Sequence, residues 1–196
     1  MGMIKGINPA FQHGEYLFRR KVFKLFGGAF HVYDTNGNVL FYSKQKAFKL
    51  REDFRIYSDE SMSQELLSIT TPHILDIGAT YNIRDATTGE AVGALRRKGL
   101  KSIIKDEWVI LSKEGQEIGI VAENSIVTAL LSRFVGLIPQ TYVVRTNDRE
   151  VAEIKQHFNP FVLKYTMTIS DVGFSIDPRL LIATGILLAG IERRQK

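Results

Sequence analysis

The sequence predicts a mainly β fold, a closed antiparallel barrel of about twelve strands that encloses a hydrophobic C-terminal helix. Two observations support this prediction. The segment 180–191 has only one polar side chain, Thr184, and short β-rich runs joined by tight turns fill most of the chain before it. A closed barrel of about twelve strands is too wide for side chains alone to fill. An apolar helix along the axis would fill it, so the two observations agree.

The apolar segment is expected to be a buried helix over about residues 178–192. A helix of its length spans roughly 18 Å, whereas a bilayer core is about 30 Å thick. It is therefore too short to cross a membrane unaided. It is also apolar on every face, unlike a surface helix, which leaves a helix surrounded by protein. Asp177 can cap its first turn and Pro178 suits that turn.

Alternating or continuous apolar runs between turn residues predict the strands. The predicted strands cover residues 16–26, 29–34, 38–43, 54–57, 65–70, 79–85, 90–96, 106–112, 116–122, 141–145, 151–156 and 161–169. One helix-like run, 125–134, interrupts this series. Because strand follows strand through short turns, the pairing is expected to be antiparallel.

Four turns in this pattern contain residues that favour tight turns. Asn36-Gly37 lies between two β-rich runs and predicts a type I′ hairpin, in which both central residues have positive φ. Thr88-Gly89, Glu114-Gly115 and Asn147-Asp148 occupy equivalent places in later hairpins. A meandering sheet of this size tends to close on itself, since closure removes exposed edges.

The chain is predicted to form one domain. It has 196 residues, 44% of them hydrophobic, which suffices for one core. Residues 1–15 are expected to be a flexible lead and residues 16–196 the barrel domain. The absence of cysteine excludes disulfides, thiol catalysis and Cys-ligated zinc. It also fits a reducing cytoplasm, so we expect a cytoplasmic protein, with the inner membrane surface as a possible peripheral location.

Three stretches carry a family likeness: Phe30–Phe41, Ala91–Lys98 leading to Trp108, and Asp177–Glu192. They resemble the LURP-one-related proteins, a family within the tubby C-terminal-like superfamily that also includes the phospholipid scramblases. The resemblance covers about residues 16–192 and implies a twelve-stranded barrel around a central hydrophobic helix.

The resemblance also implies candidate activities. Tubby-like domains bind phosphoinositide headgroups through basic surface residues, and scramblases are linked to calcium-dependent lipid movement. This sequence lacks the cysteines for lipid anchoring. The segment before its last helix offers only Asp171 and Asp177, whereas a calcium ion takes six to eight oxygen ligands. Calcium-dependent scrambling is therefore not expected here.

No set of residues predicts catalysis, a cofactor or a metal. The histidines, at positions 13, 31, 73 and 157, are scattered, and none has a His or Cys partner at ligand spacing. The sequence contains no phosphate-binding loop, dinucleotide fingerprint or nucleophile elbow. Asp171 and Asp177 are expected to form a turn and cap the last helix. We therefore expect a protein that is not an enzyme.

Basic residues are the best binding candidates. Residues 1–105 hold 16 Lys and Arg against 10 Asp and Glu, whereas the rest holds 10 against 11. A basic surface can meet phosphate in lipid headgroups or nucleic acid. The primary candidate site for a lipid headgroup comprises Arg96, Arg97, Lys98, Lys101 and Lys105. The secondary candidates are Arg19, Arg20, Lys21, Lys44 and Lys46.

The leading hypothesis is a non-enzymatic module that binds anionic, phosphoinositide-like headgroups at a membrane surface. One alternative is a protein-interaction or regulatory scaffold, whose charge serves only solubility. Another is nucleic-acid binding, which exposed aromatic side chains among the cations would favour. Scramblase-like lipid transfer ranks last, since it requires a wholly apolar helix to leave the core. The oligomeric state is left open.

Overall fold

The computed structural model describes residues 4–21, 29–44, 53–71, 78–98, 107–124, 139–159, 162–171, 173 and 175–191. These residues form a closed twelve-stranded barrel in which each strand pairs antiparallel with both of its neighbours. The strands are β1 Glu15–Lys21, β2 Ala29–Tyr33, β3 Val39–Lys44, β4 Asp53–Tyr57, β5 Glu65–Thr70, β6 Thr80–Asp85, β7 Ala91–Arg97, β8 Glu107–Leu111, β9 Glu117–Glu123, β10 Thr141–Thr146, β11 Arg149–His157 and β12 Val162–Ile169.

The barrel closes because the first and last strands pair. Each strand bonds to its neighbours in the chain, and β1 bonds to β12 over seven residue pairs, from Glu15 opposite Thr168 to Lys21 opposite Val162. A strand is present at each of the twelve predicted places, with small differences at the ends, and residues 22–26 of the first predicted strand lie outside the described residues. The predicted helical run 125–134 lies outside the described residues.

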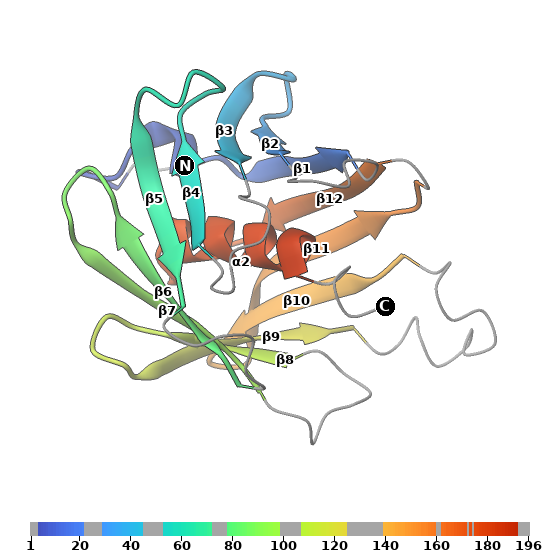
Figure 1. Ribbon diagram of the computed structural model, residues 1–196. Coiled ribbons are helices and arrows are strands. Elements are labelled where there is room, and N and C mark those ends of the chain that lie inside the picture. The colour runs from blue at the N-terminus through green and yellow to red at the C-terminus, as the bar shows by residue number, and fades with distance from the viewer. Residues whose placement is uncertain are drawn as a thin grey trace.

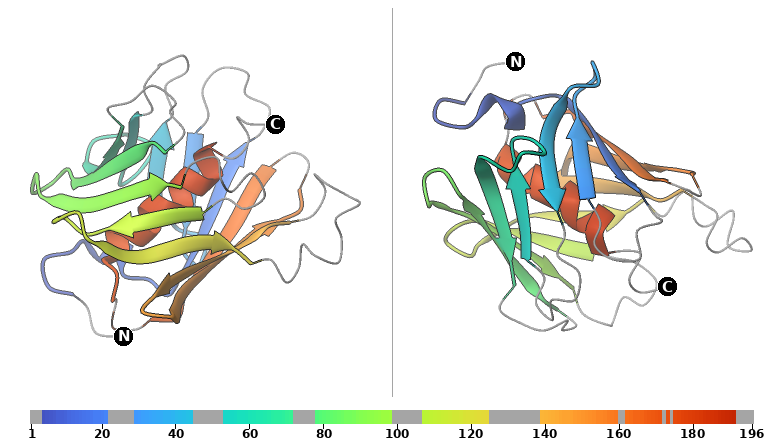
Figure 2. Two further views of the ribbon diagram at one scale, coloured as in Figure 1. Left: turned by 90° about the horizontal axis from the view of Figure 1, so that it is seen from below. Right: turned by 45° about the horizontal axis from the view of Figure 1, so that its top comes forward.

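Helix α2 (Pro178–Ile191) lies inside the barrel, as predicted (Figure 1). Both further views show it running through the ring of strands (Figure 2). Every side chain described in it, from 178 to 190, is buried. The Asp177 carboxylate accepts a hydrogen bond from the Arg179 backbone N–H at 2.9 Å, which confirms the predicted cap.

The helix gives the barrel two distinct ends. At the cap end, α2 begins after its cap residue Asp177, beside Asp85 at the end of β6. At the distal end, α2 terminates near the end of β1, where the Arg20 guanidinium donates to the Gly190 carbonyl at 3.4 Å. Successive strands alternate in direction, so all odd-numbered strands end at the distal end. The basic stretches that begin in β1, β3 and β7 therefore lead to one end of the barrel.

The predicted turn types were partly wrong. Gly37 has φ of 85°, but Asn36 does not have positive φ, so this hairpin lacks the predicted type I′ turn. The Asp34 carboxylate instead accepts bonds from the Asn36 and Asn38 N–H groups, and β2 and β3 shift register beside the turn. Asn147 and Asp148, with φ of 46° and 62°, have the conformation of a two-residue type I′ turn.

The N-terminal lead contacts the barrel. A short 3₁₀ helix, Pro9–Phe11, places the Phe11 ring 4.6 Å from the Phe41 ring, and Phe11 is 1% exposed. The Gln12 side chain bonds to the backbone of Ile4 and Ile7. Flexibility of residues 1–15 stays a prediction, but residue 11 belongs to the core.

Candidate anion-binding surface

The two outward-facing cations of the primary candidate site are neutralised by carboxylates. Arg96 Nη2 lies 2.5 Å from Glu117 Oε1, and Lys98 Nζ lies 2.5 Å from Glu107 Oε1. Both pairs join neighbouring parts of the outer wall formed by β7, β8 and β9. A phosphate group would have to compete with these carboxylates for either cation.

Arg97, the other described member of this candidate site, does not join Arg96 and Lys98. Arg97 faces the opposite side of β7, where its guanidinium carbon lies 5.9 Å from the centre of the Trp108 ring. Trp108 in turn lies 5.7 Å from the Tyr81 ring. Lys101 and Lys105 lie outside the described residues. The primary site therefore stays a prediction, and the structure does not bring its described members to one point.

The secondary candidate residues also differ in where their side chains lie, and some of these side chains are not described. The guanidinium of Arg20 faces inward at the distal end, 5.0 Å above the Phe30 ring and bonded to the end of α2. For Lys21 and Lys44 only the backbone is described, at the ends of β1 and β3, and Lys46 lies outside the described residues. Arg19 is exposed on the outer wall.

Strand pairing places three further basic residues around Arg19. Arg19 on β1 is paired with Lys164 on β12, which is paired with His157 on β11. Lys155 precedes His157 by two positions and therefore faces the same side of β11. We call these four residues the wall cluster. Sequence reasoning found only Arg19, because the other three come from strands that are distant from it in the sequence.

The cations of the wall cluster have no acidic partner in the described part of the chain. No ion pair within 4.0 Å between described residues includes Arg19, Lys155 or Lys164. This distinguishes the cluster from Arg96 and Lys98. An incoming anion would therefore meet positive charge that the protein itself has not neutralised.

His157 reports the electrostatic potential at this surface. Partial burial lowers its pKa, and the positive charges of Lys164 and Lys155 lower it further. Its Nε2 atom lies 2.8 Å from the Thr166 hydroxyl, which can hydrogen-bond the neutral ring. A bound anion would favour the protonated imidazole and reverse this shift.

The same row of paired residues continues into aromatic side chains. His31 on β2 is paired with Arg19, then Tyr42 on β3 with His31, and Tyr57 on β4 with Tyr42. The His31 ring lies 5.1 Å from the Tyr42 ring, and its Nε2 atom lies 2.6 Å from a Glu60 carboxylate oxygen. All three are partly exposed, so the wall cluster borders a polar aromatic surface.

A buried ion-pair network at the cap end was not predicted. Arg179, 6% exposed, donates to Asp85 on β6 at 2.8 Å and to Asp177 at 2.7 Å. Hydrogen bonds also fix Asp171, which accepts from Ser175 N–H and hydroxyl groups. Asp171 and Asp177 thus form the predicted turn and cap. Asp85 begins the turn Asp-Ala-Thr-Thr-Gly, and nothing in that motif predicted a partner in the last helix.

Two further features concern the described residues alone. No helix there is both long and apolar enough to span a bilayer. Nor do the described His, Asp and Glu side chains form a group of three that could hold a metal ion.

Comparison with known protein families gives a match. A family model described as LURP-one-related matches residues 39–189, most of the barrel and nearly all of α2. The chain belongs to the LURP-one-related family. This confirms the resemblance found in the sequence, and the family is related to the tubby-like proteins and scramblases. A search of curated proteins found no match to this LURP-one-related chain.

Proposed function

We propose that this LURP-one-related protein is a non-enzymatic module that binds anionic phospholipid headgroups at a cytoplasmic membrane surface. The observation that carries the proposal is the wall cluster, whose cations lack carboxylate partners among the described residues. Membership of a family related to tubby-like proteins is consistent with it. Arg19 supplies a guanidinium that can bind phosphate through two bonds, while Lys155 and Lys164 supply point charges.

The energy available from this surface is modest. Each basic residue near an anionic membrane contributes about 1 kcal/mol, and salt screens the attraction. The wall cluster alone therefore supports weak, salt-sensitive binding. The basic stretches that lead to the distal end from β1, β3 and β7 could add to it, since their sequences contain further lysines such as Lys46 and Lys101.

The experiment is vesicle co-sedimentation with two variants of equal charge. Arg19→Gln/Lys164→Gln removes two unpaired cations from the wall cluster, and Arg96→Gln/Lys98→Gln removes two paired ones. Neutral, anionic and phosphoinositide-containing vesicles are compared at low and physiological salt. We expect binding to anionic vesicles that the first variant loses and the second keeps. Equal loss in both would indicate a response to net charge alone.

Other outcomes would redirect the assignment. Loss only in Arg96→Gln/Lys98→Gln would favour the primary site predicted from sequence. Absence of binding to all vesicles would overturn the lipid proposal and favour a protein-interaction scaffold.

Single-stranded nucleic acid is a second candidate ligand. It is favoured by the row in which Arg19 adjoins His31 and Tyr42, because bases stack on aromatic side chains while cations track the phosphates. Titration of a fluorescent single-stranded oligonucleotide tests it. We expect Tyr42→Ala to weaken such binding and to leave vesicle binding unchanged.

A further inference from the structure

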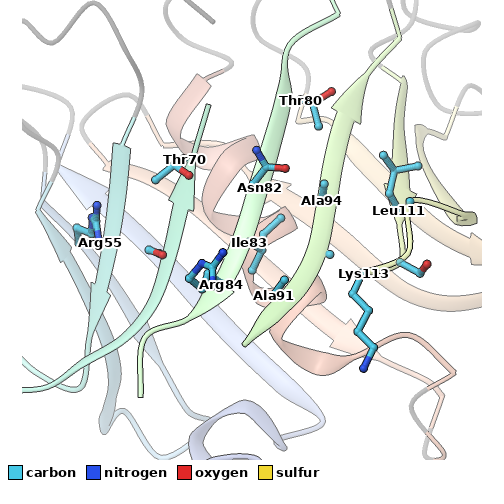
Figure 3. Close-up of a pocket in the computed structure, with 14 residues that line it drawn as sticks. Arg55, Thr70, Thr80, Asn82, Ile83, Arg84, Ala91, Ala94, Leu111 and Lys113 are labelled. Atoms are coloured by element: carbon cyan, nitrogen blue, oxygen red, sulfur yellow. The ribbon is translucent and has the colours of Figure 1, made fainter. Parts of the chain in front are cut away.

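A hollow of about 570 Å³ lies on the outer wall of β4 to β8 (Figure 3). In the barrel order, β6 and β7 lie across from β1 and β12, which carry Arg19 and Lys164. The volume falls in the usual range for small-molecule sites, roughly 300–1,000 Å³. Because it lies on the opposite side of the barrel, the hollow is separate from the proposed headgroup-binding surface.

Small side chains create the hollow. Two rows of paired residues cross it: Ser68, Arg84 and Ala91 in one, and Thr70, Asn82, Ala94 and Leu111 in the other. Gly93 lies in its floor, where a Cβ atom would come within 2.3 Å of the Leu111 carbonyl oxygen and 3.2 Å of Leu180. The floor therefore rests directly on the first turn of α2, which cannot move outward to fill the space.

The lining has the chemistry of a site for a polar anion. Among the described residues that line it are three cations, Arg55, Arg84 and Lys113, and no carboxylate. Asn82, Ser68, Thr70, Thr80 and Ser112 add an amide and four hydroxyl groups. Amides and hydroxyls both donate and accept hydrogen bonds, and so match the hydroxyl groups of a ligand.

The cations differ in how far the protein neutralises them. Asp53 and Glu65 hold Arg55 at 2.7 and 3.0 Å, and Glu90 lies 3.7 Å from Lys113. Arg84 is exposed, and its guanidinium donates only to the Gly89 carbonyl among the residues that the structure describes. Arg84 is therefore the group that can bind an anion without first losing a salt bridge.

The polar side chains beside Arg84 are also available. Within the described ranges, the side chains of Ser68, Thr70, Thr80 and Asn82 make no hydrogen bond to the protein. Ser68 is only 7% exposed and lines the hollow, so a molecule reaches its hydroxyl group by entering the hollow. Polar side chains without a protein partner, beside a guanidinium without a carboxylate partner, can form hydrogen bonds to a hydroxylated anion.

We propose that this hollow binds a small polyhydroxylated anion, either a sugar phosphate or a sugar acid. Arg84 binds the phosphate or carboxylate, and Asn82 with the neighbouring hydroxyl groups binds the polyol. The proposal does not depend on the headgroup-binding function, because the wall cluster contributes no residue to the hollow.

The test uses amide chemical shifts of the full chain, titrated with glucose 6-phosphate, gluconate, glucose and inorganic phosphate. We expect saturable shifts in β5 to β8 with glucose 6-phosphate or gluconate, and weaker binding of glucose and of phosphate. Arg84→Gln should reduce affinity about tenfold, the loss of one charge-assisted contact. Arg145→Gln, an exposed arginine on β10 outside the hollow, should not change it. Asn82→Ala should weaken the sugar ligands more than phosphate.

Several results would overturn the proposal. They are the absence of saturable shifts with both anionic sugars at millimolar concentration, equal effects of Arg84→Gln and Arg145→Gln, and inorganic phosphate binding as tightly as glucose 6-phosphate. Arg19→Gln/Lys164→Gln separates the two sites, since it should abolish vesicle binding and leave the sugar titration unchanged.

Discussion

The Arg179 guanidinium lies 2.8 Å from the Asp85 carboxylate, although 94 residues separate them in the sequence. Both side chains are buried, and the pair joins the first turn of the inner helix to the end of β6. Asp177 completes the contact, because it caps the same helix and binds the same guanidinium. The network thus fixes where α2 begins relative to the barrel.

Breaking this pair should destabilise the protein strongly. Asp85→Asn removes the carboxylate on β6 that binds the buried Arg179 guanidinium and leaves Asp177 as its remaining close partner. Loss of one member of a buried pair costs up to about 3–5 kcal/mol. Glu117→Gln is the matched control, since its pair with Arg96 is exposed and worth at most about 1 kcal/mol. Urea unfolding measures both. A cost for Asp85→Asn no larger than that of the control would show that the network does not anchor the helix.

Stability should also depend on the ionisation of Asp85. Burial raises its pKa, but hydrogen bonds from Thr87 and Arg179 outweigh this, and the net pKa is lowered. A lowered folded-state pKa stabilises the protein above the unfolded value of about 3.9, and this stability disappears as pH falls through the folded-state pKa. We expect the melting temperature of Asp85→Asn to fall less steeply below about pH 4 than that of the wild type. Parallel curves would contradict this.

A methyl group at Gly185 should not fit. A Cβ atom there would lie 2.4 Å from Cζ of Phe18, whose ring is fully buried on β1. Overpacking of this kind costs about 1–3 kcal/mol, so Gly185→Ala should lower the free energy of unfolding by that amount. Gly14→Ala is the control, because nothing lies within 4 Å of its Cβ position. Phe18→Leu should recover part of the loss in the double variant if the ring is the obstacle.

The titration of His157 provides a direct measure of the wall cluster. Burial and the charges of Lys164 and Lys155 hold its pKa below the ordinary value. Lys164→Gln should therefore raise the pKa of His157, and so should binding of a soluble phosphoinositide headgroup to the wild type. NMR titration of the imidazole proton measures both shifts. Lys113→Gln, on the far wall, should leave the pKa unchanged, and an equal shift in that variant would indicate a general response to net charge.

Local patterns were sufficient to predict the architecture. Period-two alternation and turn residues predicted all twelve strands, because a strand in a barrel must present one face to the core and one to solvent. The segment 180–191, apolar on every face apart from Thr184, predicted a helix surrounded by protein, since a surface helix would have a polar face. The type I′ turn was misassigned to Asn36-Gly37, where the Asp34 carboxylate stabilises a different turn.

Partners that are distant in the sequence could not be predicted in this way. Barrel closure pairs Arg19 with Lys164, and the inner helix places Arg179 against Asp85. The residues that adjoin each of these positions in the sequence do not indicate either partner. The same limit applies to the basic run 96–98, where only the structure shows that Glu117 and Glu107 neutralise two of its cations. The sequence by itself determined the barrel and its helix, because hydrophobic periodicity is a local property. The tertiary structure decided which charges are paired and which are available, because electrostatic interactions depend on distance in space.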